Sequence, residues 1–368
     1  MSVYYILLGT PVLLKIMLLF LGKDNVLKKN DYLKAEKKII AVFFIIFFFI
    51  LALRRKDIGV DLSNYEFYFK RNAGLSYSDL TRFKTEYGYS ALNKFVMDIH
   101  NDFQFYLGVV AFITVLPLGI LYYQESENAL LSIGIFINLS VFNMLFSGLR
   151  QSIAIAISVL AFYCVKNKKL LWFLLCVFLA YNFHRSAIVL LVLYPIFNIK
   201  LTTKSLIAII PVMSVIFVFK EKVFNFLLTY FADDYNSKYG VQESNGAYMV
   251  LLLFTLFLIY SFFMIDDSVA DKEVLGLRNV MVLATCIQFF ASLNTVAMRV
   301  NYYFIPLIPL LISKVYYRAN EENKKVVTAA NIIMIVFFFG YFFYTAYTGS
   351  DILQIFPYKA FWQEGVID

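Results

Sequence analysis

The sequence predicts an all-α membrane protein that crosses a lipid bilayer about twelve times. Aliphatic, aromatic and sulfur-containing residues make up 61% of the 368 positions, whereas charged residues make up 16%. Apolar runs recur along the whole chain at lengths suited to a hydrocarbon layer about 30 Å thick. The runs show no period-two alternation, and backbone polar groups in lipid must be bonded internally, so we expect helices and not barrel strands.

The apolar runs follow one another from end to end, so we treat residues 1–368 as a single integral membrane domain. The run that begins at Tyr4 lacks a basic leader and a small-residue cleavage site, which favours a retained span over a signal peptide. Two runs are shorter than a full crossing and are compatible with a broken pair or a re-entrant segment: 170–183 and 187–199. The twelve candidate spans are residues 4–22, 39–53, 105–123, 129–146, 150–165, 170–183, 187–199, 205–219, 248–265, 279–297, 302–316 and 326–345.

The distribution of Lys and Arg predicts the orientation in the membrane. If the twelve spans hold, five basic connections fall on one side, which the positive-inside rule makes cytoplasmic. Both termini and two long loops, about 54–104 and 220–247, then lie outside. Loop 54–104 is also basic, but a loop of that length translocates largely regardless of charge. The excess of Lys and Arg in the predicted cytoplasmic connections explains most of the net charge of +8, so we expect no nucleic-acid partner. The basic connections are 23–38, 166–169, 200–204, 266–278 and 317–325.

Polar residues interrupt the apolar pattern at four places, and all four lie toward the outside under this topology. Charged side chains near hydrocarbon are costly and tend to face a cavity or a partner. Snorkelling anchorage is an equally good explanation for the first place, and a lone histidine is more often structural. The places are 54–65, Ser147–Gln151, Tyr181–Ser186, and a stripe of Gln288, Ser292, Thr295 and Arg299 whose spacing puts them on one helical face.

Several arginines with one histidine suit an anionic ligand. A guanidinium group offers a fixed fork of donors that matches phosphate oxygens. His184 adds a side chain that titrates near neutrality when unperturbed. A diphosphate attached to a lipid is the natural candidate at that depth in the membrane.

The sequence lacks the motifs that are typical of nucleotide hydrolysis, metal binding and proton transport. We find no phosphate-binding loop, no C-x-x-C or H-E-x-x-H cluster, and carboxylates are nearly absent from the spans. We therefore expect no metal site, no cofactor, no nucleotide hydrolysis and no proton relay of the usual transporter type. The three cysteines fall in apolar runs, so no disulfide is expected.

Five motifs occur in an order that resembles the EpsG-like branch of the Wzy polysaccharide polymerases, over about residues 50–310. Val60 stands where that family often has Thr, and Arg185 follows the histidine here. The motifs are R-x-x-x-G-x-D-x-x-x-Y (Arg55, Gly59, Asp61, Tyr65), Glu86–Tyr89, Gly148–Ala154, Leu179–Ala187 and Arg299–Phe304.

The resemblance implies a metal-independent glycosyltransferase of the bacterial cytoplasmic membrane. Its fold would be similar to membrane-embedded lipid-dependent glycosyltransferases, with an outward-facing cavity in the lipid bilayer. It would polymerise undecaprenyl diphosphate-linked oligosaccharides into capsule, exopolysaccharide or O-antigen, with a chain-length regulator as a further candidate partner. An O-antigen-type ligase or related lipid-dependent glycosyltransferase would need the same residues. A flippase or transporter of lipid-linked oligosaccharide is a third alternative, which the outward concentration of polar residues disfavours.

The chemistry assigns expected roles to the motif residues. Arg150 and Arg299, with Arg55 or Arg185 as further candidates, would stabilise the leaving diphosphate. His184 would orient or deprotonate the acceptor hydroxyl, with Asp61 or Glu86 as the alternative base. One base suffices, because inversion requires no covalent sugar intermediate. The expected substrate contacts are Arg55, Tyr65, Glu86, Gln151, Arg185, Asn301, Tyr302 and Tyr303.

Overall fold

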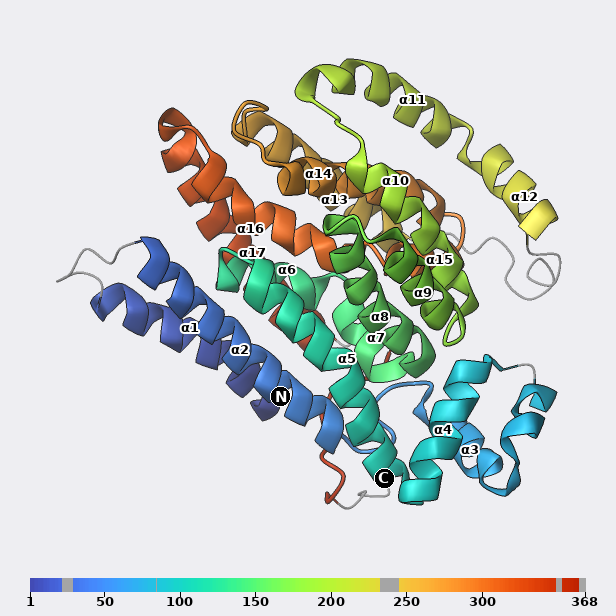
Figure 1. Ribbon diagram of the computed structural model, residues 1–368. Coiled ribbons are helices and arrows are strands. Elements are labelled where there is room, and N and C mark those ends of the chain that lie inside the picture. Colours follow the sequence, from blue (N-terminus) through green and yellow to red (C-terminus); the bar gives the residue numbers. More distant parts are fainter. Residues whose placement is uncertain (22–28, 84, 232–244, 349–352, 364–368) are drawn as a thin grey trace.

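The computed structural model describes residues 1–21, 29–83, 85–231, 245–348 and 353–363. Within these ranges the regular structure is helical, and the only strand-like pairings are isolated bridges, Arg54 with Ala360 and Ile265 with Ala319. The chain therefore forms a helical bundle (Figure 1), as the sequence predicts.

The first half of the chain contributes two long helices, a short helical insertion and a central group. Each predicted apolar run in this half coincides with a helix or a helix pair. The elements are α1 Ser2–Leu21, α2 Lys29–Leu53, α3 Leu62–Arg71, η1 Asn72–Gly74, η2 Tyr77–Phe83, α4 Tyr87–Ile99, α5 Phe103–Glu125, α6 Ala129–Asn138, α7 Val141–Ser147 and α8 Leu149–Lys166.

The second half starts with short apolar helices and ends with long ones. Here too the predicted runs are helical. The elements are α9 Leu170–Tyr181, η3 Arg185–Val192, α10 Leu193–Asn198, η4 Thr203–Ser205, α11 Leu206–Val218, α12 Lys220–Phe231, α13 Asn245–Met264, α14 Lys272–Ala291, α15 Thr295–Asn301, η5 Ile305–Leu307, α16 Ile308–Arg318, η6 Glu321–Asn323 and α17 Lys324–Thr348.

Several predicted spans are shorter or more broken than full membrane crossings. Among the described residues, six helices are long and apolar enough to cross a membrane, and a seventh span results if α6 and α7 are counted together. Those two helices are bent by 57° relative to each other. The chain is an integral membrane protein on this basis, but the predicted total of twelve spans is not confirmed.

The predicted outer loop 54–104 folds into a small helical cap. Figure 1 shows α3 and α4 as a separate group beside the start of α5. Tyr65 and Phe69 of α3 and Tyr89 of α4 share an apolar core with Tyr106 of α5 and Leu149 of α8. The cap is thus packed onto the N-terminal ends of α5 and α8, which fixes the motif residues that it carries.

The C-terminal segment returns to the loop that follows α2. The backbone of Arg55 donates to Lys359 O at 2.9 Å, and that of Gly59 donates to Gln354 O at 3.1 Å. The Tyr4 hydroxyl of α1 donates to the carbonyl of Ile355, which is fully buried. The segment therefore braces the loop on which the first motif lies.

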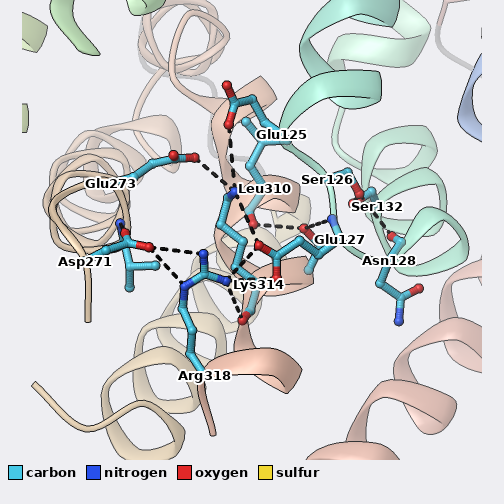
Figure 2. Close-up of polar contacts among 12 residues, drawn as sticks. Glu125, Ser126, Glu127, Asn128, Ser132, Asp271, Glu273, Leu310, Lys314 and Arg318 are labelled. Atoms are coloured by element: carbon cyan, nitrogen blue, oxygen red, sulfur yellow. Dashed lines mark hydrogen bonds and ion pairs between the residues drawn. The ribbon is translucent and has the colours of Figure 1, made fainter. Parts of the chain in front are cut away.

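A buried ion-pair network closes the opposite end of the bundle (Figure 2). The Lys314 ammonium of α16 has a side chain only 5% exposed and lies 3.0 Å from Glu273 of α14 and 3.8 Å from Glu125 of α5. The Lys166 ammonium of α8 lies 2.7 Å from Glu125 and 2.8 Å from Glu273. Buried charges need such partners, because an unpaired charge away from water is costly. The network joins the ends of four helices.

The described residues of the five basic connections predicted to be cytoplasmic meet at this same end, whereas residues 23–28 of the first connection lie outside the described structure. Ion pairs and hydrogen bonds join these connections to one another or to the neighbouring α5–α6 turn. Figure 2 shows those made by Arg318. Which face of the membrane this end occupies stays a prediction from the positive-inside rule. The joining contacts are Arg318 with Asp271 and Glu127, Lys166 with Glu273, Thr203 with Asp267, and Glu36 with the backbone of Ala129.

Candidate functional site

Arg150 lies at the end of the bundle opposite to the ion-pair network, in the first turn of α8. Its Nη1 donates to Glu86 Oε2 at 2.6 Å, and its guanidinium lies 6.0 Å from the centre of the Tyr89 ring. The Tyr65 hydroxyl is a further close neighbour. The Arg150 side chain is 33% exposed and uses only Nη1 for Glu86. The donors of the guanidinium that face neither Glu86 nor Tyr65 are therefore open to a ligand.

Gly59 and Asp61 fasten the first motif beside Arg150. Gly59 has a φ of +120°, and a Cβ there would lie 2.3 Å from the carbonyl oxygen of Phe146 in α7, so only glycine fits. The backbone N–H of Asp61 donates to Ser147 Oγ at 3.2 Å, and Ser147 Oγ donates to Asp61 Oδ2 at 3.2 Å. Asp61 thus anchors the loop to the residue that ends α7.

Gly88 brings the second motif to the histidine motif. Its N–H donates to the carbonyl of Asn182 at 2.9 Å, and a Cβ at this position would lie 2.9 Å from the same oxygen. Glu86, the N-cap residue of α4, is consequently held close to both Arg150 and the turn that carries His184. The close backbone contact explains why glycine stands between two tyrosines in this motif.

His184 lies in the turn between α9 and η3, outside both apolar helices, and is half-buried. Its Nδ1 lies 2.7 Å from Ser186 Oγ, which in turn lies 2.9 Å from the Tyr303 hydroxyl. Burial lowers the pKa of His184 to about 4; Glu86 opposes the shift, whereas Arg150 and Arg299 add to it. The imidazole is therefore neutral at physiological pH and able to accept a proton.

Arg299 reaches the same neighbourhood from α15. Its backbone carbonyl accepts a hydrogen bond from Gln151 Nε2 at 2.6 Å, and its charge acts on His184. The residue is exposed, and no carboxylate among the described residues forms an ion pair with it. Arg299 is thus an uncompensated cation beside the Arg150 and His184 side chains.

The predicted polar stripe that leads to Arg299 is wrong as a single helical face. The helix stops at Ala291 and resumes at Thr295, so the spacing of one continuous helix does not apply. Gln288 and Ser292 are buried; the first donates to the carbonyl of Ala247, and the second accepts from Lys220 at 2.8 Å. The side chain of Thr295 lies outside the described part of the structure. At these two positions the stripe is buried and bonded to neighbouring helices.

The other predicted contacts are distributed unevenly. Arg55 pairs with Asp57 at 2.5 Å and donates to Gln363 O at 3.2 Å, and no contact in the described structure joins it to Arg150. Arg185 is exposed, without an ion-pair partner in the described ranges. Asn301 is fully buried and donates to Ala284 O at 2.9 Å, so no surface of it is open to a substrate. Tyr302 is buried near Arg299.

Three residues outside the expected catalytic and substrate-contact residues contribute to the site. Ser186 bridges His184 and Tyr303, Tyr89 lies beneath Arg150, and Ser147 holds Asp61. Ser186 and Tyr89 belong to the motifs, so the motif pattern contained a signal for them. Their roles depend on contacts between distant segments, which spacing along the chain does not reveal.

An apolar cavity of about 630 Å³ lies elsewhere, between α2 and α5. Its lining includes Phe44, Phe48, Leu116 and Tyr123, and none of the predicted site residues lines it. The polar cluster, and not this cavity, is therefore the candidate site.

A model of the EpsG family matches residues 37–360. No curated protein and no solved structure matches the chain. The matched range contains every residue of the candidate site.

Proposed function

Because the chain belongs to the EpsG family, we propose that it is a polymerase of lipid-linked oligosaccharides. In this proposal its substrates are undecaprenyl diphosphate-linked repeat units, and its product is a capsule, exopolysaccharide or O-antigen chain. The reaction takes place at the outer face of the bacterial cytoplasmic membrane. The long apolar helices support the membrane setting.

The observation that carries the proposal is the convergence of Arg150, Arg299 and His184 at one end of the bundle. Two guanidinium groups with free donors suit the oxygens of a diphosphate. A neutral imidazole beside them suits a hydroxyl that must lose its proton. A glycosyl diphosphate donor and a sugar acceptor need these two functions side by side.

The transfer follows from these groups. The acceptor oxygen forms a bond to the anomeric carbon of the growing chain while the bond from that carbon to the diphosphate oxygen breaks. The bonding pair leaves with the diphosphate, whose developing charge Arg150 and Arg299 stabilise. The acceptor proton passes to His184 and then to solvent. Exposed Arg185, the next residue in the chain, is a third cation for the same diphosphate.

The asymmetry of the molecule favours an enzyme over a flippase. The site lies at one end, whereas ion pairs of Lys314 and Lys166 tie α5, α8 and α14 together at the other. A transporter would need to open that end, which means separating several buried charges. A ligase would use the same site with a different acceptor.

Purified protein in lipid vesicles, supplied with lipid-linked repeat units, tests the proposal. We expect a ladder of products that differ by one repeat unit, with release of one lipid diphosphate for each bond formed. Transfer of a single chain to an unrelated acceptor would indicate a ligase. Movement of the intact lipid-linked unit across the bilayer without bond formation would indicate a flippase. A vesicle preparation without protein is the control.

A further inference from the structure

The apolar cavity between α2 and α5, here called the α2–α5 groove, takes no part in the proposed reaction. It has a volume of about 630 Å³, and its lining on α5 extends from Phe112 to Gln124. Ile45 and Phe49 of α2 and Leu116 of α5 also line it, and each is between 45% and 56% exposed. Because α5 is long and apolar enough to span a membrane, these exposed side chains face hydrocarbon. The groove is therefore open to lipid.

The groove has a packed aromatic floor. Gly119 of α5 lies against Phe44 of α2, and a Cβ at this glycine would be 3.2 Å from the Cβ of Phe44. The Phe44 side chain is buried and stacks on Tyr122, with ring centres 5.4 Å apart. Side chains packed in this way hold the shape of a pocket in the absence of a ligand. The groove is thus a preformed feature of the pair of helices.

The two ends of the groove differ in character. Beyond one end, Gln104 Nε2 of α5 donates to the carbonyl of Ala52 in α2 at 2.6 Å, which joins the two helices. At the other end, the Lys37 ammonium lies 5.6 Å from the centre of the Tyr123 ring. Lys37 is one helical turn before Ala41, which lines the groove, so both residues lie on the same face of α2. The groove is therefore basic at the end that carries the ion-pair network.

The charge of Lys37 is uncompensated within the described structure. The adjacent Glu36 is fully buried and is bound by Lys15 of α1. Glu127, which follows α5, pairs with Arg318 at 2.8 Å. Lys37 itself forms no ion pair with a described carboxylate and is half-buried. A cation at the edge of the hydrocarbon layer tends to face an anionic partner, and here that partner must come from outside the chain.

We propose that the α2–α5 groove binds one anionic phospholipid, with an acyl chain along the groove and the phosphate at Lys37. Basic pockets between membrane helices bind anionic headgroups in this way. Tyr123 and Gln124, which line the same end, supply neutral donors for the phosphate oxygens. The site is separate from the polar cluster, because Val110 packs into the core of the cap from the face of α5 that is nearly opposite Phe112. The proposal is independent of the proposed function.

Native mass spectrometry of the purified full chain, titrated with phosphatidylglycerol or with phosphatidylcholine of the same acyl chains, tests the headgroup contact. We expect the first phosphatidylglycerol to bind about fivefold or more tightly than the first phosphatidylcholine. Lys37→Gln should remove this preference, and Lys37→Arg should keep it. Lys272→Gln, which changes an exposed lysine at the same end of the bundle, is the matched control and should also keep it. Equal binding of the two lipids by the parent, or an unchanged preference in Lys37→Gln, would overturn the proposal.

Blocking the groove tests the position of the acyl chain. Ala41→Trp places an indole at the basic end of the groove, so it should weaken phosphatidylglycerol binding and abolish the rise in Tm that this lipid gives the parent. Leu252→Trp, at a position of α13 that is 53% exposed, is the control and should leave both unchanged. The proposal is wrong if Ala41→Trp keeps the binding and the rise in Tm. It is also wrong if Ala41→Trp removes a dimer mass instead of a bound lipid, which would mean that a second copy of the chain fills the groove.

Discussion

Arg150→Ala should abolish formation of long polysaccharide, with a loss of rate of about 10²–10³-fold or more, as for removal of one fixed donor to a developing oxyanion. The substitution removes a guanidinium whose free donors face the site. Cells that rely on the variant should accumulate lipid-linked single repeats while the amount of protein in the membrane stays the same. Chain-length profiles on gels and quantification of the lipid-linked pool measure both effects.

The ion pair with Glu86 requires a control, because Arg150→Ala leaves a half-buried carboxylate unpaired. The double variant Arg150→Ala with Glu86→Gln removes that charge and should be just as inactive. Recovery of polymer in the double variant would mean that Arg150 serves only to neutralise Glu86. Arg71→Ala, at the end of α3 in the same helical cap, is the matched control and should leave chain length unchanged.

His184→Ala should lower the rate by at least about a hundredfold, the usual contribution of a general base. The imidazole is neutral and lies near enough to both arginines for their charges to act on it. Single-turnover rates with lipid-linked repeat units measure the effect, and His100→Ala is the matched control. A rate within a few-fold of the parent would move the role to Asp61 or Glu86, which Asp61→Asn and Glu86→Gln would then distinguish.

The pH profile gives a second readout for the same residue. Burial lowers the pKa of His184 from 6.5 to about 4, and Arg150 and Arg299 contribute to the shift. Only the neutral ring accepts a proton, so kcat/KM should fall on the acid side near pH 4 and not near 6.5. A bound diphosphate neutralises the two arginines, so the acid limb of kcat should lie at a higher pH than that of kcat/KM.

The fold could be predicted as a set of helices but not as a set of spans. Apolar composition locates a helix in lipid because its backbone must be bonded internally. Apolar composition does not show that α6 and α7 are bent by 57°, or that α14 stops at Ala291. A helix can break within the membrane where neighbouring helices bond the backbone groups that the break leaves free, and those neighbours are distant in sequence. The Lys314 network was missed for a related reason, since its partners come from α5 and α14.

The site could be predicted in part because its residues share motifs, and the rest depends on contacts between motifs. Arg150 and Glu86 are 64 positions apart, and only the packing of the cap on α8 brings them to 2.6 Å. The same holds for Ser186 and Tyr303, which are 117 positions apart. Asn301 illustrates the converse, because a motif residue can be conspicuous in sequence and fully buried in the fold.

A structure of the protein with a lipid-linked oligosaccharide diphosphate bound is the most direct test of the central claim. We expect phosphate oxygens within hydrogen-bond distance of the guanidinium groups of Arg150 and Arg299, and His184 Nε2 facing the space beside the anomeric carbon. A diphosphate bound anywhere else, with Arg150 contacting only Glu86 and Arg299 left in solvent, would contradict it.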